Sequence, residues 1–414
     1  MYTAVALCAV GAEKALSNEL RKLELHVLFS GFGRVRFQAE LAGLYRALMS
    51  LRTADRVLLE AATFPAADFE ALFEGTRAIA WEDLVPTGAH VVVTKVRSNR
   101  SALTAETSIQ AVVHKAAADR LCSRWEVSRL SEAGLAVEIR AYLEKDQASI
   151  LVDLSGEPLF RRGYRTEGGA APLRETTAAA ILLLMGWKRK FPLRDPFCGS
   201  GTFAIEAALY AWDAAPGLGR RFALSELAFG DRETETTVRA ELAAKVNFNN
   251  VIRIEGSDFD GRAVSIARSN AERAFELARG LVPVAGIRLP GQTAVGSAST
   301  SGGVERGALP VFRVLPMAQA RAAEEEGFLV MNPPYGERLG DLEQAEKTYR
   351  EMGILTDSFP GWTMGAVTNH PGFESHFGYA ASSVREITNG ALRSYLYTYD
   401  RLGRRNDVDR RRAR

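Results

Sequence analysis

The sequence predicts an α/β protein, with a doubly wound, mostly parallel sheet in its C-terminal half and smaller α+β units before it. The chain has 414 residues, and about 100–200 residues per domain indicates two or three domains. From about residue 170 onward, helices alternate with strongly apolar strands. This alternation is typical of a parallel sheet that carries helices on both faces.

The composition indicates a soluble protein of a reducing compartment. Charged residues make up 25% and hydrophobic residues 47% of the chain, and no apolar run reaches the ~18 residues that span a bilayer. The three cysteines, Cys8, Cys122 and Cys198, form no CxxC pair, which argues against a disulfide framework and a zinc site. The N-terminus lacks the basic start and apolar run of a signal peptide. We therefore expect a cytoplasmic protein with no membrane contact and no metal.

The first sixty residues predict a small α+β unit. Residues 2–10 are apolar and predict a strand, and residues 11–23 place apolar side chains at helical spacing. Residues 33–39 alternate as a strand does, and the segment 41–64 predicts a helix that runs into a strand. We assign residues 1–60 to this first unit.

Residues 61–156 predict a second α/β unit. Helices are expected over 69–81 and 102–125, and strands over 90–98, 135–145 and 147–156. Polar and basic residues are expected at the turn between the first strand and the long helix: Lys95, Arg97, Ser98, Asn99 and Arg100. A helix N-terminus offers free N–H groups to an anion. The turn is either a phosphate-binding surface or a plain solvated loop.

Two further segments stand out by composition. Residues 288–309 are rich in Gly, Ser and Thr and predict a mobile surface insertion. The tail, residues 401–414, carries seven arginines and two aspartates, although the net charge of the whole chain is only +2. Such a tail either attracts phosphate without sequence preference or is a solvated end.

The first chemical motif is FPLRDPFCGSGTFAIEAALYA, residues 191–211. An apolar strand ends in Asp195, Gly199 and Gly201 predict a tight turn, and a helix follows. The GxGxxG pattern of dinucleotide-binding loops is absent. An acidic residue beside the turn favours a ligand with a cationic group, such as an amino acid moiety, over a pyrophosphate.

The second motif, IEGSDFDGRAVSIARSNAERA, covers residues 254–274. Its strand ends in Asp258, which is placed to accept both ribose hydroxyls of an adenosine. Asp260 has an alternative role as the N-cap of the following helix. The 63 positions between Asp195 and Asp258 exceed the ~20 of a simple dinucleotide fold, so we expect an extra helical segment between them.

The third motif is FLVMNPPYGERLG, residues 328–340. Two prolines after a strand fix an extended path that has no N–H donors. Asn332 adds a side-chain carbonyl, and Tyr335 offers a flat face on which a base can stack. Two acceptors and a stacking face suit an exocyclic NH2 group on a planar ring, although a plain Pro-Pro loop is the alternative.

These three motifs, in this order, resemble the class I S-adenosylmethionine-dependent methyltransferases that act on exocyclic amino groups. Residues 159–187 resemble the segment before the methyltransferase core of THUMP-containing RNA guanine-N2 methyltransferases, which include bacterial 23S rRNA enzymes. The resemblance implies a ferredoxin-like unit over 1–60, a THUMP RNA-binding domain over 61–156, and a Rossmann-like methyltransferase domain with a seven-stranded sheet over 157–400. Residues 157–190 are its lead-in segment.

The resemblance also implies roles for individual residues. The cofactor would be S-adenosyl-L-methionine, held by Thr176, Asp195, Phe197, Gly199, Ser200, Gly201, Thr202, Asp258, Phe259 and Asn332. The catalytic residues would be Asn332, Pro333, Pro334 and Tyr335. If the turn after the strand is a phosphate-binding surface, Lys95, Arg97, Asn99 and Arg100 would bind the RNA. An acid that contacts adenine is expected near residues 312–320, but Leu315, Pro316 and Met317 stand there.

The expected partner is RNA, with large-subunit rRNA preferred over tRNA. The Asn332 side chain and the Pro333 carbonyl would accept the two N–H groups of guanine N2, so that positioning carries catalysis. Cys198 is interpreted as a small apolar residue. The NPPY motif also occurs in adenine-N6 DNA methyltransferases and in enzymes that methylate a glutamine amide. A non-catalytic RNA-binding factor that keeps the fold is a further alternative.

Overall fold

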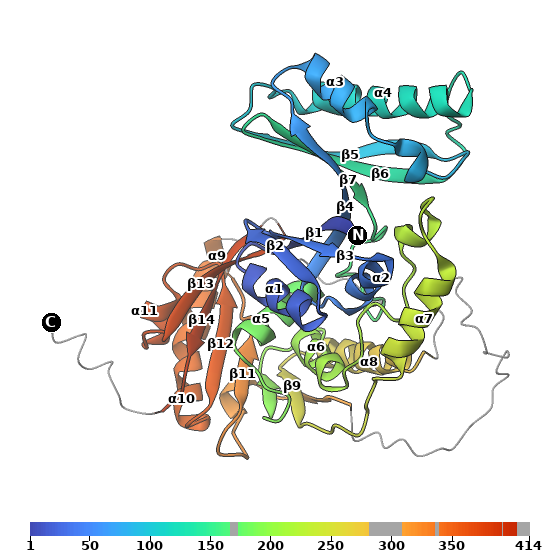
Figure 1. The fold of residues 1–414 in the computed structure, drawn as a ribbon. Coiled ribbons are helices and arrows are strands. Elements are labelled where there is room, and N and C mark those ends of the chain that lie inside the picture. Colours follow the sequence, from blue (N-terminus) through green and yellow to red (C-terminus); the bar gives the residue numbers. More distant parts are fainter. Residues whose placement is uncertain (166–172, 281–308, 336–338, 391, 404–414) are drawn as a thin grey trace.

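The computed structural model describes residues 1–165, 173–280, 309–335, 339–390 and 392–403. Two seven-stranded sheets dominate this part of the chain (Figure 1). The predicted insertion and the predicted basic tail lie almost entirely outside the described residues.

The first unit contains four strands and two helices. Its strands are β1 (Tyr2–Cys8), β2 (His26–Gly31), β3 (Arg34–Ala39) and β4 (Ala54–Pro65), and its helices are α1 (Glu13–Lys22) and α2 (Leu41–Ser50). The prediction missed β2, because most of its side chains are exposed and show no apolar alternation. The other expected elements are confirmed, and the helix that was expected to run into a strand ends at Ser50, four residues before β4.

One sheet continues from the first unit into the second, in the order β2-β3-β1-β4-β7-β6-β5. The second unit adds α3 (Phe69–Arg77), β5 (His90–Asn99), α4 (Glu106–Trp125), β6 (Ala136–Glu144) and β7 (Gln147–Asp153). The twelve-residue β4 pairs with β1 through its first half and with β7 through its second half. The expected boundary at residue 60 therefore falls inside a strand.

The predicted turn at residues 95–100 is wrong in its position. β5 continues to Asn99, so Lys95, Arg97 and Asn99 lie in the strand at the edge of the sheet, and only Arg100 follows it. The strand expected over 90–98 is confirmed, and it carries a register shift against β6 between Val93 and Lys95. All four predicted RNA-binding side chains are exposed.

The second sheet has the order β10-β9-β8-β11-β12-β14-β13. The strands are β8 (Leu193–Asp195), β9 (Ile254–Asp258), β10 (Val311–Val314), β11 (Phe328–Met331), β12 (Thr363–Thr368), β13 (Ser383–Asn389) and β14 (Leu392–Tyr399). β14 is antiparallel to both of its neighbours, and the other pairs are parallel. This confirms the predicted Rossmann-like sheet.

Helices flank this sheet as the α/β pattern predicts. They are α5 (Glu175–Leu184), α6 (Thr202–Ala211), α7 (Arg232–Ala243), α8 (Gly261–Ala278), α9 (Leu339–Glu351), α10 (Leu355–Ser358) and α11 (Phe373–Phe377). Short 3-10 helices cover Trp81–Asp83, Ala223–Glu226, Met317–Gln319 and Met352–Ile354. α7 lies between Asp195 and Asp258, which confirms the extra helical segment.

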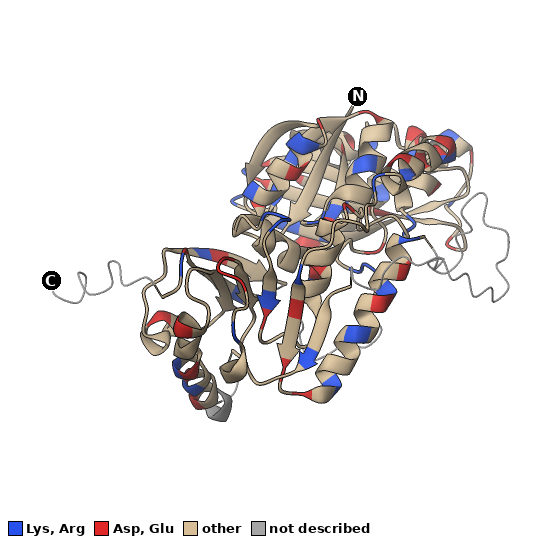
Figure 2. Ribbon diagram, turned by 90° about the horizontal axis from the view of Figure 1, so that it is seen from below, with Lys and Arg blue, Asp and Glu red and all other residues tan. Residues whose placement is uncertain are grey.

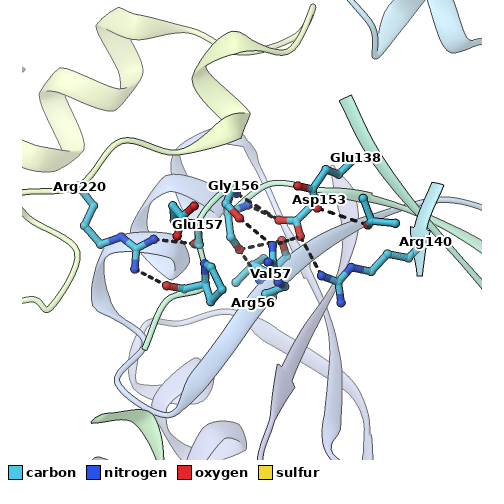
Figure 3. A network of polar contacts seen from close by, with 11 residues as sticks. Arg56, Val57, Glu138, Arg140, Asp153, Gly156, Glu157 and Arg220 are labelled. Carbon is cyan, nitrogen blue, oxygen red and sulfur yellow. Dashed lines mark hydrogen bonds and ion pairs between the residues drawn. The ribbon is translucent and has the colours of Figure 1, made fainter. Parts of the chain in front are cut away.

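A network of polar contacts surrounds the end of β7 and the segment that follows it (Figure 3). The Asp153 carboxylate at the end of β7 contacts Arg56 at 2.5 Å and Arg140 at 3.4 Å. The Arg220 guanidinium donates to the Glu157 carbonyl at 2.6 Å. One continuous apolar core also runs through both parts. The shared core and the helix pairs α1–α5 and α2–α7 thus join the N-terminal units to the second domain.

Charges of both signs are mixed along the described helices and strands that Figure 2 shows. Lys and Arg are interspersed with Asp and Glu along the helices and strands (Figure 2), as the near-neutral net charge suggests. Within the described residues, no helix combines the length and the apolar character needed to cross a membrane.

Candidate active site

Three predicted site residues lie at the carboxyl ends of neighbouring strands in the second sheet. Asp195 is the last residue of β8, Asp258 is the last residue of β9, and Asn332 directly follows β11. These strands are parallel neighbours in the order β9-β8-β11. Their carboxyl ends form the crevice where open α/β sheets bind ligands.

The glycine-rich loop after β8 is fastened to β9. The Cys198 N–H donates to the Ser257 carbonyl at 2.9 Å, and the Gly199 N–H donates to the Asp258 carboxylate at 3.0 Å. Gly201 has φ +86°, and a Cβ there would lie 2.9 Å from the Phe312 ring. Glycine is therefore required at this N-cap of α6.

Asp195 is a buried carboxyl group, only 2% exposed. Burial raises its pKa well above the usual range, and the nearby Asp258 charge raises it further, against a 3.0 Å hydrogen bond from the Phe197 N–H. Among the described residues, no basic side chain is paired with Asp195. A cationic ligand group would favour its ionised form.

The loop also leaves room for a ligand. A Cβ built on Gly199 meets no atom within 4 Å. Open space beside two carboxylates and the N-terminus of α6 fits a ligand that carries an ammonium group and a carboxylate. The residues present thus fit the amino acid end of S-adenosylmethionine.

The structure distinguishes Asp258, the last residue of β9, from Asp260 two positions later. The Asp258 carboxylate also accepts from the Asp260 N–H at 3.0 Å, while the Asp260 side chain accepts from the Arg262 N–H at 2.8 Å. Asp260 is therefore the N-cap of α8, as the alternative interpretation states. Asp258 lies in the loop contacts, and its proposed contact with a ribose stays a prediction.

The remaining predicted cofactor residues divide into two groups. Phe197, Ser200 and Thr202 lie in the glycine-rich loop or at its end, and Phe259 follows Asp258 with 78% of its surface exposed. Thr176 lies on α5, and its hydroxyl donates to Asp55 of β4 at 2.5 Å. In this structure the Thr176 hydroxyl thus contacts the N-terminal unit, and its predicted place beside the cofactor stays a prediction.

The NPPY loop carries two hydrogen bonds from tyrosines. The Tyr335 hydroxyl donates to the side-chain carbonyl of Asn332. The hydroxyl of Tyr349, a fully buried residue of α9, donates to the Pro334 carbonyl at 2.7 Å and also contacts Thr368 at 2.9 Å. The Asn332 acceptor is therefore engaged by Tyr335 in this state, and the Pro334 carbonyl is held by α9.

Sequence reasoning missed two residues that support the site. Tyr349 gave no signal, because a tyrosine in a helix resembles any core residue. Arg165, in the lead-in segment, donates to the Thr202 hydroxyl at 2.8 Å and lies 3.6 Å from the Glu175 carboxylate. The sequence analysis identified the lead-in segment that contains Arg165. It did not reveal the hydrogen bond to Thr202, because the two residues are 37 positions apart in the sequence.

Apolar residues follow β10, where an adenine-contacting acid was expected. Leu315 and Met317 pack with Phe197 in the second apolar cluster. The Leu315 N–H donates to the Asp258 carbonyl at 2.9 Å. This part of the crevice therefore offers apolar walls beside Asp258.

The thiol of Cys198 is 5% exposed, and burial raises its pKa far above the usual range. The nearby Asp195 and Asp258 charges raise it further. A thiol that stays protonated is a poor nucleophile. This supports the interpretation of Cys198 as a small apolar residue.

Glu346, His370 and His376 form a group of potential metal ligands close to Tyr349. However, His370 Nδ1 accepts from the Gly372 N–H at 3.0 Å, and His376 Nδ1 faces the Arg350 guanidinium at 3.2 Å. With Nδ1 accepting, the Nε2 atom of each ring carries a proton and faces the Glu346 carboxylate. This tautomer suits a hydrogen-bonded cluster, since a ligating Nε2 must be unprotonated.

Comparisons with known proteins agree with this geometry. Residues 162–285 and 305–397 match the family described as the RMKL-like methyltransferase domain, and residues 3–58 match the RlmL ferredoxin-like domain. The chain is 34% identical over 405 residues to a Bacillus subtilis protein, YpsC, which is provisionally named an RNA methyltransferase; the match covers 96% of each chain.

A second relative is the ribosomal RNA large subunit methyltransferase K/L of Methylococcus capsulatus, 35% identical over 402 residues. That match covers 94% of this chain and 50% of the relative, so the chain spans about half the length of the K/L proteins. Among solved structures, the provisionally assigned methyltransferase SMU.472, complexed with SAH, is 35% identical with a TM-score of 0.82. The match covers 96% of this chain and 97% of that one.

Proposed function

Because the chain belongs to the RMKL-like methyltransferase family, we propose that it methylates the exocyclic N2 of a guanine in structured RNA, specifically large-subunit (23S) rRNA. S-adenosylmethionine is the methyl donor. The observation that carries the proposal is the meeting of Asp195, Asp258 and Asn332 at the ends of three neighbouring parallel strands. The proposal includes a cytoplasmic location.

The cofactor end of the site lies around the glycine-rich loop. Asp195 would hold the ammonium group of S-adenosylmethionine, and Asp258 the ribose hydroxyls, with Leu315 and Met317 as apolar walls for the base. When bound, S-adenosylmethionine supplies an activated methyl group on a sulfonium centre. Arg165 keeps the Thr202 hydroxyl turned toward the lead-in segment.

The substrate end lies at the NPPY loop. The Asn332 side-chain carbonyl and the Pro333 main-chain carbonyl would accept the two N–H groups of the guanine amine and aim its lone pair. The nitrogen attacks the methyl carbon, so that an N–C bond forms as the S–C bond breaks, and one proton then leaves the nitrogen. Positioning and electrostatics account for catalysis in this scheme.

Base entry requires Tyr335 to release Asn332. In the described state the Tyr335 hydroxyl occupies the acceptor that the substrate amine would use. Its release frees the acceptor and presents the ring as a stacking face for a flipped-out base. RNA recognition by residues 61–156, as a THUMP domain with Lys95, Arg97, Asn99 and Arg100, is part of the proposal. Arg97 lies 3.1 Å from Glu106 and would exchange that partner for phosphate.

Nucleoside mass spectrometry of rRNA and tRNA from cells with and without the gene tests the proposal. We expect N2-methylguanosine to be lost from one 23S rRNA position in the deletion strain. Loss of N2-methylguanosine from tRNA alone would show that tRNA is the substrate. Loss of N6-methyladenosine would show that the enzyme methylates adenine. Unchanged modification in both RNA classes would contradict the proposal.

An in vitro assay tests the role of Asn332. We expect Asn332→Ala to lower methyl transfer to 23S rRNA at least about a hundredfold and to leave SAH affinity within twofold, because the cofactor loop is intact. The matched control is Asn249→Ala, which removes an exposed amide between α7 and β9. A folded wild-type protein without affinity for S-adenosylmethionine would favour a non-catalytic RNA-binding factor.

A further inference from the structure

A row of three hydrogen bonds leads from the segment after β12 to the NPPY loop. The His370 N–H donates to the Thr368 hydroxyl at 3.1 Å, and the Thr368 hydroxyl lies 2.9 Å from that of Tyr349. The Tyr349 hydroxyl donates to the Pro334 carbonyl at 2.7 Å. Thr368 and Tyr349 are both fully buried. Each of these hydroxyl groups therefore depends on partners inside the protein.

The hydrogen bonds of this row can run in one direction only. The Pro334 carbonyl can only accept, so the Tyr349 hydroxyl uses its proton there. Burial raises the pKa of Tyr349, which keeps this hydroxyl protonated. The proton between the two hydroxyl oxygens then comes from Thr368, whose oxygen accepts the His370 N–H. All three bonds thus point toward the NPPY loop, and in a buried row each bond strengthens the next.

Contacts from several segments hold His370 at the start of the row. Its Nδ1 accepts from the Gly372 N–H at 3.0 Å, and its Nε2 lies 3.5 Å from the Glu346 carboxylate of α9. The same carboxylate lies 3.4 Å from Nε2 of His376 on α11. The His370 carbonyl accepts from the Tyr397 hydroxyl of β14 at 3.3 Å. The start of the row is therefore fixed to two helices and to the sheet.

The other end of the row controls the conformation of the NPPY loop. The Pro334 carbonyl belongs to the peptide group that leads into Tyr335, and the Tyr335 hydroxyl donates to the Asn332 side chain. The proline ring fixes φ at Pro334, so the direction of its carbonyl is the main backbone freedom before Tyr335. A donor that holds this carbonyl therefore also holds the residues that would position the substrate amine.

We propose that Thr368 is a further positioning residue for methyl transfer, because it links the fixed main chain of His370 to Tyr349 and so to the NPPY loop. The inference rests on the proposed function insofar as this loop holds the substrate amine. Looser geometry in the loop lowers the fraction of complexes that can react, and hence kcat. A threonine with a purely structural role would stabilise the fold and leave turnover unchanged.

The experiment replaces Thr368 by valine, which has the same shape but no hydroxyl group. With the full chain and 23S rRNA from a strain that lacks the gene, we expect Thr368→Val to lower kcat about three- to tenfold. SAH affinity and the KM for the rRNA should stay within about twofold, because the change affects the reactive geometry and not binding. Thr368→Ser keeps the hydroxyl group and should restore kcat to within about twofold of wild type.

Thr356→Val is the matched control. Thr356 of α10 is also buried, and its hydroxyl donates to the Gly353 carbonyl at 2.8 Å and lies 3.2 Å from the Tyr379 hydroxyl. Both valine variants lose buried hydrogen bonds, so both should melt about 2–4 °C below wild type. Only Thr368→Val should lose turnover. Equal kcat values in the two valine variants would overturn the proposal.

A double variant tests whether Thr368 acts through Tyr349. Because the two residues belong to one row, we expect Tyr349→Phe combined with Thr368→Val to have a kcat within about twofold of Tyr349→Phe alone. Losses that multiply in the double variant would show that Thr368 acts by another route, and would overturn the proposed role.

Amide hydrogen exchange tests the row without any RNA. We expect exchange over residues 331–335 to be about tenfold faster in Thr368→Val than in wild type, and unchanged in Thr356→Val. Unchanged exchange in both variants would overturn the inference. A wild-type protein that methylates no guanine in 23S rRNA would instead contradict the proposed function, and the exchange rates would still decide whether Thr368 holds the loop.

Discussion

The Tyr349 hydroxyl donates to the Pro334 carbonyl across 2.7 Å, and this contact ties α9 to the loop after β11. Proline locks φ at residues 333 and 334, so the ψ angle of Pro334 decides where Tyr335 lies. Tyr349 is therefore a positioning residue. We expect Tyr349→Phe to lower kcat about tenfold, because the loop loses its fixed geometry, and to leave SAH affinity within twofold, as steady-state kinetics and calorimetry would measure.

A control for this prediction is Tyr399→Phe. The Tyr399 hydroxyl, also in a largely buried ring, donates to the Tyr379 carbonyl at 3.2 Å in the same apolar cluster. Both variants should lose about 1 kcal/mol of unfolding free energy with the hydrogen bond. Only the Tyr349 variant should lose turnover. Equal kcat values in the two would show that the Pro334 contact has no role in positioning.

We expect substitution of Asp258 to weaken cofactor binding and substitution of Asp260 to lower the stability of the fold. Asp258→Ala removes the acceptor of the Gly199 N–H, so we expect SAH affinity to fall at least about tenfold, the order of a hydrogen bond to a charged group. Asp260→Ala removes only the N-cap of α8 and should cost about 1 kcal/mol of unfolding free energy. Calorimetric titration and urea unfolding measure both quantities. An Asp260 variant with the larger binding defect would reverse the assignment.

The buried Asp195 carboxyl group should make the stability of the ligand-free protein depend on pH. Burial raises its pKa in the folded protein, whereas the unfolded chain ionises near about pH 4. Between the pKa of the unfolded chain and the higher pKa of the folded protein, Asp195 is ionised in the unfolded chain and protonated in the folded protein. The ligand-free protein therefore loses stability as pH rises from the lower pKa to the higher one. Asp195→Asn should therefore raise the melting temperature at neutral pH and weaken S-adenosylmethionine binding.

The same carboxyl group makes cofactor affinity pH-dependent. A cationic ammonium group favours the ionised form, so affinity in the wild type should increase as pH rises through the raised pKa. The Asp195→Asn variant should show no such increase. Thermal melts with and without S-adenosylmethionine across pH 5 to 8 compare the two proteins. Parallel pH profiles would show that Asp195 does not hold the ammonium group.

The sequence was informative where chemistry coincides with strand ends. Asp195 and Asp258 end their strands and Asn332 follows one. Because parallel strands bring their carboxyl ends together, the sequence alone was enough to place these residues near one another. Contacts between distant segments left no such pattern. The hydrogen bonds from Thr176 to Asp55 and from Val10 to Thr388 span 121 and 378 positions. Their existence depends on how the two sheets pack.

Local irregularities account for the other differences. The exposed strand β2 shows no apolar alternation and was missed for that reason. The predicted turn at residues 95–100 was wrong in its position, because the strand that was expected over 90–98 already contains most of these residues. The hydrogen bond between Tyr335 and Asn332 was also hidden, because the motif specifies the residues and leaves their side-chain conformations open.

We expect alanine substitutions at Gly199 and Gly256 to have different effects, the first on cofactor binding and the second on stability. Gly199→Ala meets no atom within 4 Å, so the folded protein should tolerate it apart from about 1 kcal/mol of backbone strain at φ +49°. Its methyl group occupies ligand space, and we expect SAH affinity to fall at least about tenfold. Gly256→Ala places its Cβ 2.7 Å from the Phe312 ring and 2.9 Å from the Cys198 Cβ. This overpacking should cost about 1–3 kcal/mol of unfolding free energy. Calorimetry and urea unfolding separate the two, and wild-type SAH affinity in Gly199→Ala would place the cofactor away from this loop.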